Sequence, residues 1–343
     1  MFEQFSLDSL AFHEAIIAPA FADLVAADPM GYTGFLNEFT LMDNVVSSRP
    51  IIDIRRAQNI MQRRDASCDI IYKKVFGAST RKVTTEEVYG ATRMCRNEFY
   101  QGCLKDFRSK DPLFADKILP YFQGAMSVDL VTNSYFGDVD RVVGVNAQFS
   151  SNTYDGIFKW YKRYITAGVI PTGQTITIAG GADYGASPMS AYNLIKALYD
   201  KQPLLMYSFT DSQKAFYVSK EIAQGYEDYL ISVGAAGASG NIALFENGIK
   251  VRKYKGIDIL EQPLWTPVIS EIKGSAGYAA ILTIKGNFVF ATDKSYGEGE
   301  DGHTALVVWY ERKDMQWYYQ LFLKVGTQIA LPEFSTIALS AWV

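Results

Sequence analysis

The sequence predicts an α+β fold, because helical and strand-like patterns are both present and largely occupy different parts of the chain. Two segments begin with a capping residue followed by proline, Asp111-Pro112 and Ser187-Pro188, which is typical of helix N-termini. Beyond residue 240 the chain consists mainly of short β-like runs separated by turn residues. Since 48% of the 343 residues are hydrophobic, the chain can also bury a sizeable core.

The first proline-led segment predicts a long helix that ends near residues 135–138 and is kinked at Pro120. Its apolar side chains recur at roughly helical spacing, at Leu113, Phe114, Ile118, Tyr121, Phe122 and Ala125. The loop beyond it leads to an aromatic cluster, which we expect in a core or an interface and to which we assign no ligand: Phe158, Trp160, Tyr161 and Tyr164.

The second proline-led segment begins a helix, strand, strand, helix order that indicates a compact mixed α/β domain. Strands are predicted at 203–209 and 215–218, and Ser219 is predicted to cap the following helix. The apolar faces are Met189, Tyr192, Ile195 and Leu198 in the first helix and Ile222, Tyr226, Tyr229 and Leu230 in the second. Further strands are predicted at 280–284, 288–292, 305–310 and 318–325.

Charge is distributed unevenly near the N-terminus. Residues 1–48 contain seven acidic residues and no Lys or Arg, whereas residues 49–96 contain eleven basic and five acidic residues. Two solvated faces would explain this pattern, because exposed charges are individually worth little. Complementarity between an acidic arm and a basic loop on neighbouring subunits would explain it as well, since interface charges set the register of two partners.

The basic segment predicts a long two-stranded hairpin. Residues 68–75 and 82–88 are β-rich, and Gly77-Ala-Ser-Thr80 supplies turn residues between them. Such a hairpin carries more charge than core, so it is not stable alone and needs another surface to rest on.

No motif predicts an active site, a cofactor site or a metal site. Residues 180–185 have the glycine spacing of a P-loop, but Ala186-Ser187 follows where Lys-Ser/Thr is required, so a surface turn is expected there. Neither His13 nor His303 lies next to a nucleophile motif. The acidic residues before His303 do not have EF-hand spacing, and the adjacent Glu86 and Glu87 would point to opposite faces of a strand.

Composition and sequence patterning exclude several classes of protein. With 20% charged residues and a net charge of −4, the chain has neither the signature of disorder nor a basic nucleic-acid footprint. The apolar stretch 15–27 is interrupted by Pro19 and Asp23, and it fails as a signal peptide and as a membrane span. The three cysteines are an odd number without a close metal spacing, so we expect reduced thiols in a cytoplasmic protein.

In this order the elements resemble the major capsid protein family of tailed bacteriophages, whose Hong Kong 97-type fold is shared with encapsulins. Residues 111–138 resemble the family's spine helix and the loop after it, and Tyr154-Asp-Gly-Ile157 resembles the next short segment. Residues 190–230 are similar to the helix, strand and helix of the axial domain, and residues 254–265 to the strand that leaves it. Residues 287–340 resemble the closing part of the peripheral domain.

The resemblance implies a division of the chain into five parts. These are an N-terminal arm (1–50), an extended loop formed by a β-hairpin (51–95), a first peripheral part with the spine helix (96–153), an axial domain (154–279) and a closing β part of the peripheral domain (280–343). No cleaved prodomain is expected, and Lys73, Lys74 and Lys82 give no reason to expect an isopeptide cross-link.

The resemblance implies a structural protein rather than an enzyme. Copies made in the host cytoplasm would form the pentamers and hexamers of an icosahedral virion head. Its partners would be sister copies, a portal protein, scaffold or cement proteins and non-specifically packaged double-stranded DNA, with no membrane. The 21 Phe and 22 Tyr residues suit subunit interfaces. The predicted inter-subunit contact residues are Arg55, Arg56, Arg63, Arg64, Lys73, Lys74, Arg81 and Lys82 of the loop and Asp8, Glu14, Asp23 and Asp28 of the arm.

Two alternative functions stay open at this point. An encapsulin-like compartment shares the same resemblance and differs only in what the shell encloses. A soluble α/β hydrolytic enzyme would require acidic and tyrosine side chains that the sequence alone does not bring together.

Overall fold

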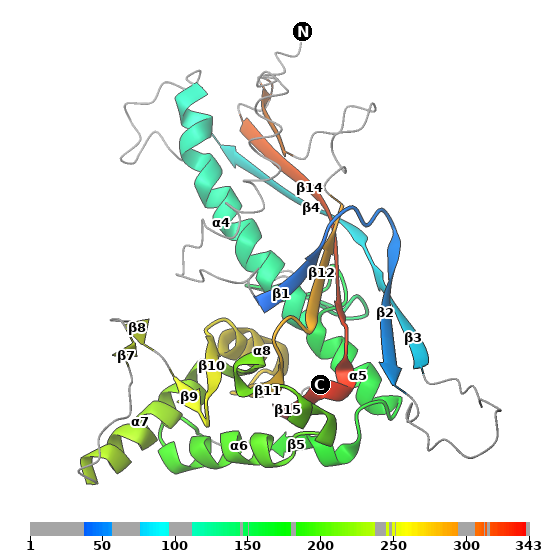
Figure 1. Ribbon diagram of the computed structural model, residues 1–343. Helices are drawn as coiled ribbons and strands as arrows, with labels where there is room; N and C mark the ends of the chain where they lie inside the picture. Colours follow the sequence, from blue (N-terminus) through cyan, green and yellow to red (C-terminus); the bar gives the residue numbers. More distant parts are fainter. Residues whose placement is uncertain are drawn as a thin grey trace, which may run out of the picture.

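The computed structural model is an α+β structure with two main β-sheets (Figure 1). A long helix, α4 (Pro112–Phe136), packs against residues of both sheets. It describes residues 38–56, 76–95, 112–144, 147–149, 151–179, 183–236, 245–246, 249–250, 252–293, 306–311, 313 and 316–340.

The helices of the described residues are α4 (Pro112–Phe136), α5 (Ile157–Thr166), α6 (Pro188–Asp200), α7 (Lys220–Ala236) and α8 (Trp265–Lys273). Short 3-10 helices cover Thr172–Gln174, Leu204–Ser208, Asp211–Gln213 and Pro332–Phe334. The strands are β1 (Phe39–Met42), β2 (Ser48–Arg56), β3 (Phe76–Thr84), β4 (Glu86–Cys95), β5 (Thr175–Ile178), β6 (Lys214–Ser219), β7 (Phe245–Glu246), β8 (Ile249–Lys250), β9 (Lys253–Tyr254), β10 (Ile257–Gln262), β11 (Ala279–Ile284), β12 (Phe288–Thr292), β13 (Leu306–Glu311), β14 (Gln316–Ile329) and β15 (Ser335–Ser340).

The five-stranded sheet is built around the long strand β14. Strand β4 pairs antiparallel along one edge of β14, while β13 and then β12 pair along the other edge. Strand β1 pairs with β12 in parallel orientation. Helix α4 runs beside this sheet (Figure 1) and approaches β4 closely, because a Cβ atom on Gly90 would lie 2.0 Å from Met126 Sδ.

The six-stranded sheet separates two apolar clusters. Its order is β5-β15-β11-β6-β10-β9, and every residue of its strand β6 is buried. Successive side chains of a strand point to opposite faces. Ala215 and Tyr217 therefore pack with α4, α5, α8 and the five-stranded sheet, whereas Phe216 and Val218 pack with α6 and α7.

Two glycines bring the end of α4 into backbone contact with the start of α5. The Gly156 amide donates to the Gly137 carbonyl oxygen at 2.8 Å, and the Gly137 amide donates to the Asn133 carbonyl oxygen at 2.9 Å. A Cβ atom on Gly137 would lie 2.0 Å from the carbonyl oxygen of Tyr154, and one on Gly156 would lie 2.5 Å from that of Asn133. No side chain fits at either position without a backbone shift.

Several elements lie where the sequence predicts them. Helix α4 ends at Phe136, α6 begins at Pro188, and residues 215–218 lie in β6. The four predicted C-terminal strands correspond to β11, β12, β13 and β14. The aromatic cluster supplies core residues, because Phe158 and Tyr161 are buried.

Two local predictions are wrong. Residues 203–209 contain a 3-10 helix rather than a strand, in which Met206 is buried while Leu204 and Leu205 face solvent. Gly77-Ala-Ser-Thr80 is not a turn, because it lies within β3 and pairs with β2. Pairing with β2 therefore overrides the turn preference of these residues.

Other features differ from the sequence-based expectation in detail. The Ser219 hydroxyl bonds to the backbone of Ala279 in β11, so it links two strands. Residues 184–186 form the expected turn, but Tyr184 is buried against Tyr278. Helices α5 and α8 were not predicted. Strands β11 and β15 both belong to the six-stranded sheet, and the division of the chain at residue 280 stays a prediction.

Candidate assembly surface and its anchor

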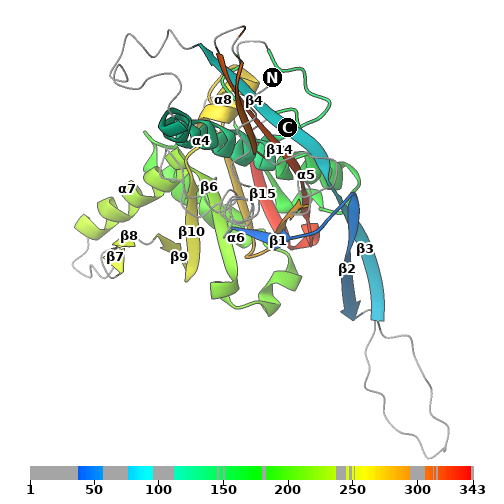
Figure 2. The same cartoon turned by 90° about the horizontal axis from the view of Figure 1, so that it is seen from above.

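Strands β2 and β3 form a two-stranded ribbon that projects from the body of the molecule (Figure 2). Their nine antiparallel pairs run from Ser48↔Thr84 to Arg56↔Phe76. Arg49 and Lys82 are exposed, and Ile52 is 61% exposed. An antiparallel ribbon of this kind has two uncovered faces, so it offers both charge and apolar surface to another molecule.

The base of the ribbon is anchored in the core. Val83 is fully buried with Val45 and Ala291, and the Thr85 hydroxyl donates to the Val45 carbonyl oxygen at 3.0 Å. Strand β14 crosses the ribbon base at Gly326, where a Cβ atom would lie 1.9 Å from the Thr84 carbonyl oxygen. The ribbon therefore leaves the body in a defined direction.

Arg81 takes part in this anchor, and its role as an inter-subunit contact residue stays a prediction. Its guanidinium donates to Glu333 Oε1 at 2.6 Å and to the Ala330 carbonyl oxygen at 2.8 Å. It also lies 5.9 Å from the ring centroid of Tyr164. Only 14% of the Arg81 side chain is exposed, and its guanidinium is paired with Glu333 of the same chain.

Replacing Arg81 by methionine is expected to destabilise the subunit by about 1–2 kcal/mol, because the partly buried Glu333 carboxylate loses its cation. Urea denaturation of the full chain measures this change. Lys82→Met, at an exposed neighbour on the same strand, is the matched control and should change the free energy of unfolding by less than about 0.5 kcal/mol. Equal effects of the two substitutions would contradict the anchoring role of Arg81.

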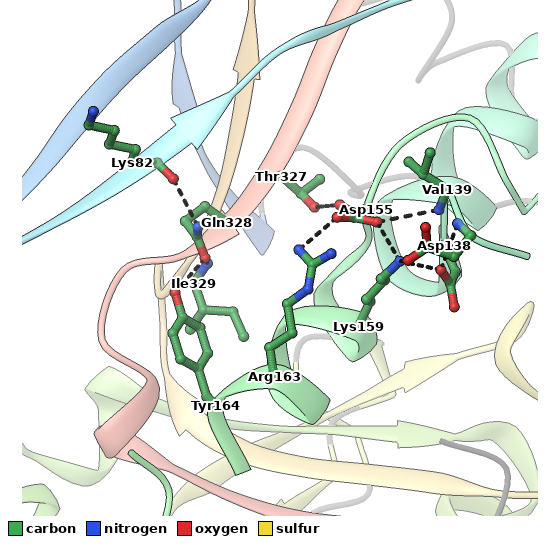
Figure 3. Close-up of polar contacts among 11 residues, drawn as sticks. Lys82, Asp138, Val139, Asp155, Lys159, Arg163, Tyr164, Thr327, Gln328 and Ile329 are labelled. Carbon is green, nitrogen blue, oxygen red and sulfur yellow. Dashed lines mark hydrogen bonds and ion pairs between the residues drawn. The ribbon is translucent and has the colours of Figure 1, made fainter. Parts of the chain in front are cut away.

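A buried amide connects the ribbon base to α5 and β14 (Figure 3). Gln328 Nε2 donates to the Lys82 carbonyl oxygen at 2.9 Å. Its Oε1 accepts from the Tyr164 hydroxyl at 2.8 Å and from the Ile329 amide at 2.9 Å. Both ends of the Gln328 side chain are thus satisfied, which fixes its orientation.

Helix α5 carries a second polar cluster at the end of α4 (Figure 3). Lys159 Nζ is paired with Asp138, with Asp140 Oδ2 at 2.6 Å and with Asp155 Oδ1 at 3.1 Å. Arg163 binds the other oxygen of Asp155 at 2.7 Å. Only 11% of the Lys159 side chain is exposed, so these ion pairs are better shielded than ordinary surface pairs.

The electrostatics of the cluster favour its charged forms. Burial alone would raise the pKa of Asp138, but hydrogen bonds from Lys159 and from the Asp140 amide, together with the charges of Lys159 and Arg141, lower it below its usual value. Burial would likewise lower the pKa of Lys159, but its bonds to the three carboxylates raise it. The Lys159 ammonium and the Asp138 carboxylate are therefore ionised together near neutral pH.

An open cleft of about 710 Å³ lies beside this cluster, lined by Phe136, Asp138, Asp140, Arg141, Phe158, Lys159, Lys162, Arg163, Thr166, Ala167 and Ile272. The charged groups of the Lys159 cluster are directed at one another. Within the described ranges, no group of three or more His, Cys, Asp and Glu side chains is placed to hold a metal ion. No helix in the same ranges has the length and apolar character needed to cross a bilayer.

The predicted contact residues are placed as follows. Arg55 and Arg56 lie on β2 near the far end of the ribbon, and Lys82 is exposed near its base. Eight others lie outside the described residues: Arg63, Arg64, Lys73, Lys74, Asp8, Glu14, Asp23 and Asp28. Pairing of the acidic arm with the basic loop stays a prediction.

The Lys159 and Gln328 contacts were not predicted from the sequence. Asp155 and Lys159 are four residues apart, which is a weak local signal on a helix. The contacts with Asp138 and the link between Gln328 and β3 depend on the tertiary fold, so no local sequence pattern predicts them.

No protein-family model matches the sequence, and no curated protein matches it. Solved structures do match. A chain of the satellite phage P4 procapsid, in a structure that includes the size determination (Sid) protein, is 11% identical with a TM-score of 0.60, over 98% of this chain and 93% of that one. A chain of the capsid of Myoviridae phage XM1 is 10% identical with a TM-score of 0.51, over 90% and 92%. A chain from Mycobacterium phage Ogopogo is 7% identical with a TM-score of 0.51, over 90% and 91%.

These similarities cover nearly the whole of both chains, so they concern the complete architecture rather than one motif. The chain has the Hong Kong 97-type fold of phage major capsid proteins, as the order of its sequence elements predicts.

Proposed function

We propose that this protein is the shell-forming major capsid protein of a tailed bacteriophage, a structural protein whose copies build an icosahedral head. The observation that carries the proposal is the projecting ribbon β2–β3 in a chain with the capsid fold. Val83 and Arg81 anchor its base in the body, while Arg49 and Lys82 near that base and Ile52 farther along the ribbon face solvent.

The physical argument is that an isolated two-stranded ribbon is at best marginally stable in water. A neighbouring subunit that covers it supplies the missing surface, and stable assemblies of this kind bury on the order of 2,000 Å² or more. The basic side chains of the ribbon would set the register of the contact rather than most of its affinity.

The proposed partners follow from this role. Copies made in the host cytoplasm would form pentamers and hexamers and enclose the phage genome in the virion. A portal protein, scaffold or cement proteins and non-specifically packaged double-stranded DNA would be the other partners. We propose no catalytic role, because the charged side chains of the Lys159 cluster are paired with one another.

The direct test is to express the full chain, with co-expressed scaffold if required, and to examine the product by negative-stain electron microscopy and sedimentation velocity. Closed shells or capsomers are the expected product. A monomer that stays monomeric at high concentration, with the ribbon protected from hydrogen exchange, would overturn the proposal.

Reversing the charge of the ribbon is expected to block assembly while the subunit still folds. Arg55→Glu combined with Arg56→Glu should abolish shells and leave the thermal unfolding midpoint of the subunit nearly unchanged. Both positions lie at the end of the ribbon farthest from its anchored base, and substitutions away from such anchors usually cost within about 0.5 kcal/mol. Arg55→Lys with Arg56→Lys preserves the charge and should still assemble. Shell formation by the Glu variant at the normal yield would remove these residues from the interface.

A further inference from the structure

Glu38 is an acidic residue placed where the two sheets meet. It directly precedes β1, and its carboxylate accepts hydrogen bonds from the Tyr135 hydroxyl of α4 and from Gln262 Nε2 of β10, the latter at 2.6 Å. Tyr135 and Gln262 are both fully buried. One carboxylate therefore connects the start of β1 to the spine helix and to the six-stranded sheet.

No cation compensates this carboxylate among the contacts of the described residues. The elements around it contribute the Tyr135 hydroxyl from α4 and Tyr217 from β6. Burial raises the pKa of Tyr217, so its hydroxyl stays protonated at neutral pH. On the β12 side, Phe288 and Phe290 pack their rings against the adjacent Phe39.

The nearest charged pair on β10 is directed elsewhere. Glu261 precedes Gln262 and is paired with Arg252, which also binds Glu227 of α7. Since neighbouring side chains of a strand point to opposite faces, this pair does not offset the charge of Glu38. Burial outweighs the two hydrogen bonds and raises the pKa of Glu38 to about 7.

Strand β1 is a short strand, and Met42 at its end packs against the Val45, Val83 and Ala291 cluster. It is an edge strand with four residue pairs to β12, and Phe39 is the only one of its four residues that is buried. Phe39 packs against Tyr135 with a ring distance of 5.3 Å, and the Thr40 hydroxyl donates to the Gly286 carbonyl oxygen at 2.8 Å. A change of charge at Glu38 therefore acts on a short edge strand of four residues.

We propose that Glu38 is a proton-controlled latch for β1: the protonated carboxyl group keeps the strand docked on β12, and the ionised carboxylate favours its release. The contacts are all made within one chain, so this inference does not depend on the proposed assembly.

The expected direction follows from proton linkage. The released strand exposes Glu38, whose pKa then returns to 4.5, whereas docking raises it to about 7. The docked state holds more protons between these values, so docking is strongest below pH 4.5 and weakens as the pH rises through 7. Between pH 5 and pH 8 the population of the released state should rise roughly 50-fold.

Hydrogen exchange of the full-length chain, read at residues 39–42 and corrected for the intrinsic pH dependence of exchange, tests the latch. The protection of β1 should fall roughly 50-fold from pH 5 to pH 8, while that of the core strand β6 in the same molecules stays constant. In Glu38→Gln the protection of β1 should not depend on pH, and the exposed Glu86→Gln should behave as the unmodified chain.

Two results would overturn the latch. One is protection of β1 that does not change with pH relative to β6 in the unmodified chain. The other is an equal pH dependence in Glu38→Gln. Because β6 is an internal reference, the first comparison decides the question even where a variant does not fold.

Discussion

Gly137→Ala is expected to lower the free energy of unfolding by about 3 kcal/mol or more, since overpacking against backbone forces a main-chain shift. The added Cβ atom would lie 2.0 Å from the Tyr154 carbonyl oxygen and 2.5 Å from that of Asn133. Both contacts are with backbone, so no side-chain rotation relieves them. The shift would also break the hydrogen bond from Gly156 to Gly137 that joins α4 to α5.

Urea denaturation of the purified full chain measures this loss, and Gly173→Ala is the matched control. A Cβ atom on Gly173 meets no atom within 4 Å, and its φ is not positive. The control should therefore change stability by no more than about 0.5 kcal/mol. Similar values for the two variants would mean that the crossing of α4 and α5 tolerates a side chain, contrary to its geometry.

The second large effect is expected from Lys159→Met, which should cost about 2–3 kcal/mol of unfolding free energy. The substitution removes the cation that Asp138 and Asp155 share. Arg163 still pairs with Asp155, but partly buried carboxylates that lose a cationic partner are destabilising. The value lies below that of a fully buried pair because Asp140 is 83% exposed and solvent screens it.

Lys162→Met is the control for this change, because Lys162 is exposed on the same helix and lines the same cleft. The acid dependence gives a second measurement. Asp138 has a pKa below its usual 3.8 in the folded chain, so its stabilising contribution is present above pH 3.8 and is lost as the pH falls through its folded value. This acid-induced loss should be smaller in Lys159→Met, and an unchanged acid dependence would contradict the ion-pair assignment.

The parts of the fold that could be predicted from the sequence are those whose signals are local. Proline in the first turn marks the starts of α4 and α6, and short β-like runs separated by turn residues mark the strands from β11 to β14. Their order along the chain was enough to predict the fold. It required no information on which strands pair.

The parts that failed depend on tertiary contacts. Leu204 and Leu205 look like strand residues but lie exposed in a 3-10 helix, because only Met206 finds a place in the core. Gly77 and its neighbours carry turn chemistry but are held extended by pairing with β2. The sequence presents Glu38 only as one of several acidic residues of an arm. In the structure its carboxylate accepts hydrogen bonds from Tyr135 and from Gln262, which is 224 positions away.

The position of β15 in the six-stranded sheet has a consequence for synthesis. This strand lies between β5 and β11 and pairs Ile337 with Thr175, about 160 residues earlier in the chain. Until β15 has been translated, β5 has no strand to pair with in this sheet, and one edge of β11 is uncovered. Uncovered edges of this kind invite pairing with other chains. The ribosome must therefore release residue 340 before this sheet can close, and crowded nascent subunits are most vulnerable to aggregation just before that moment.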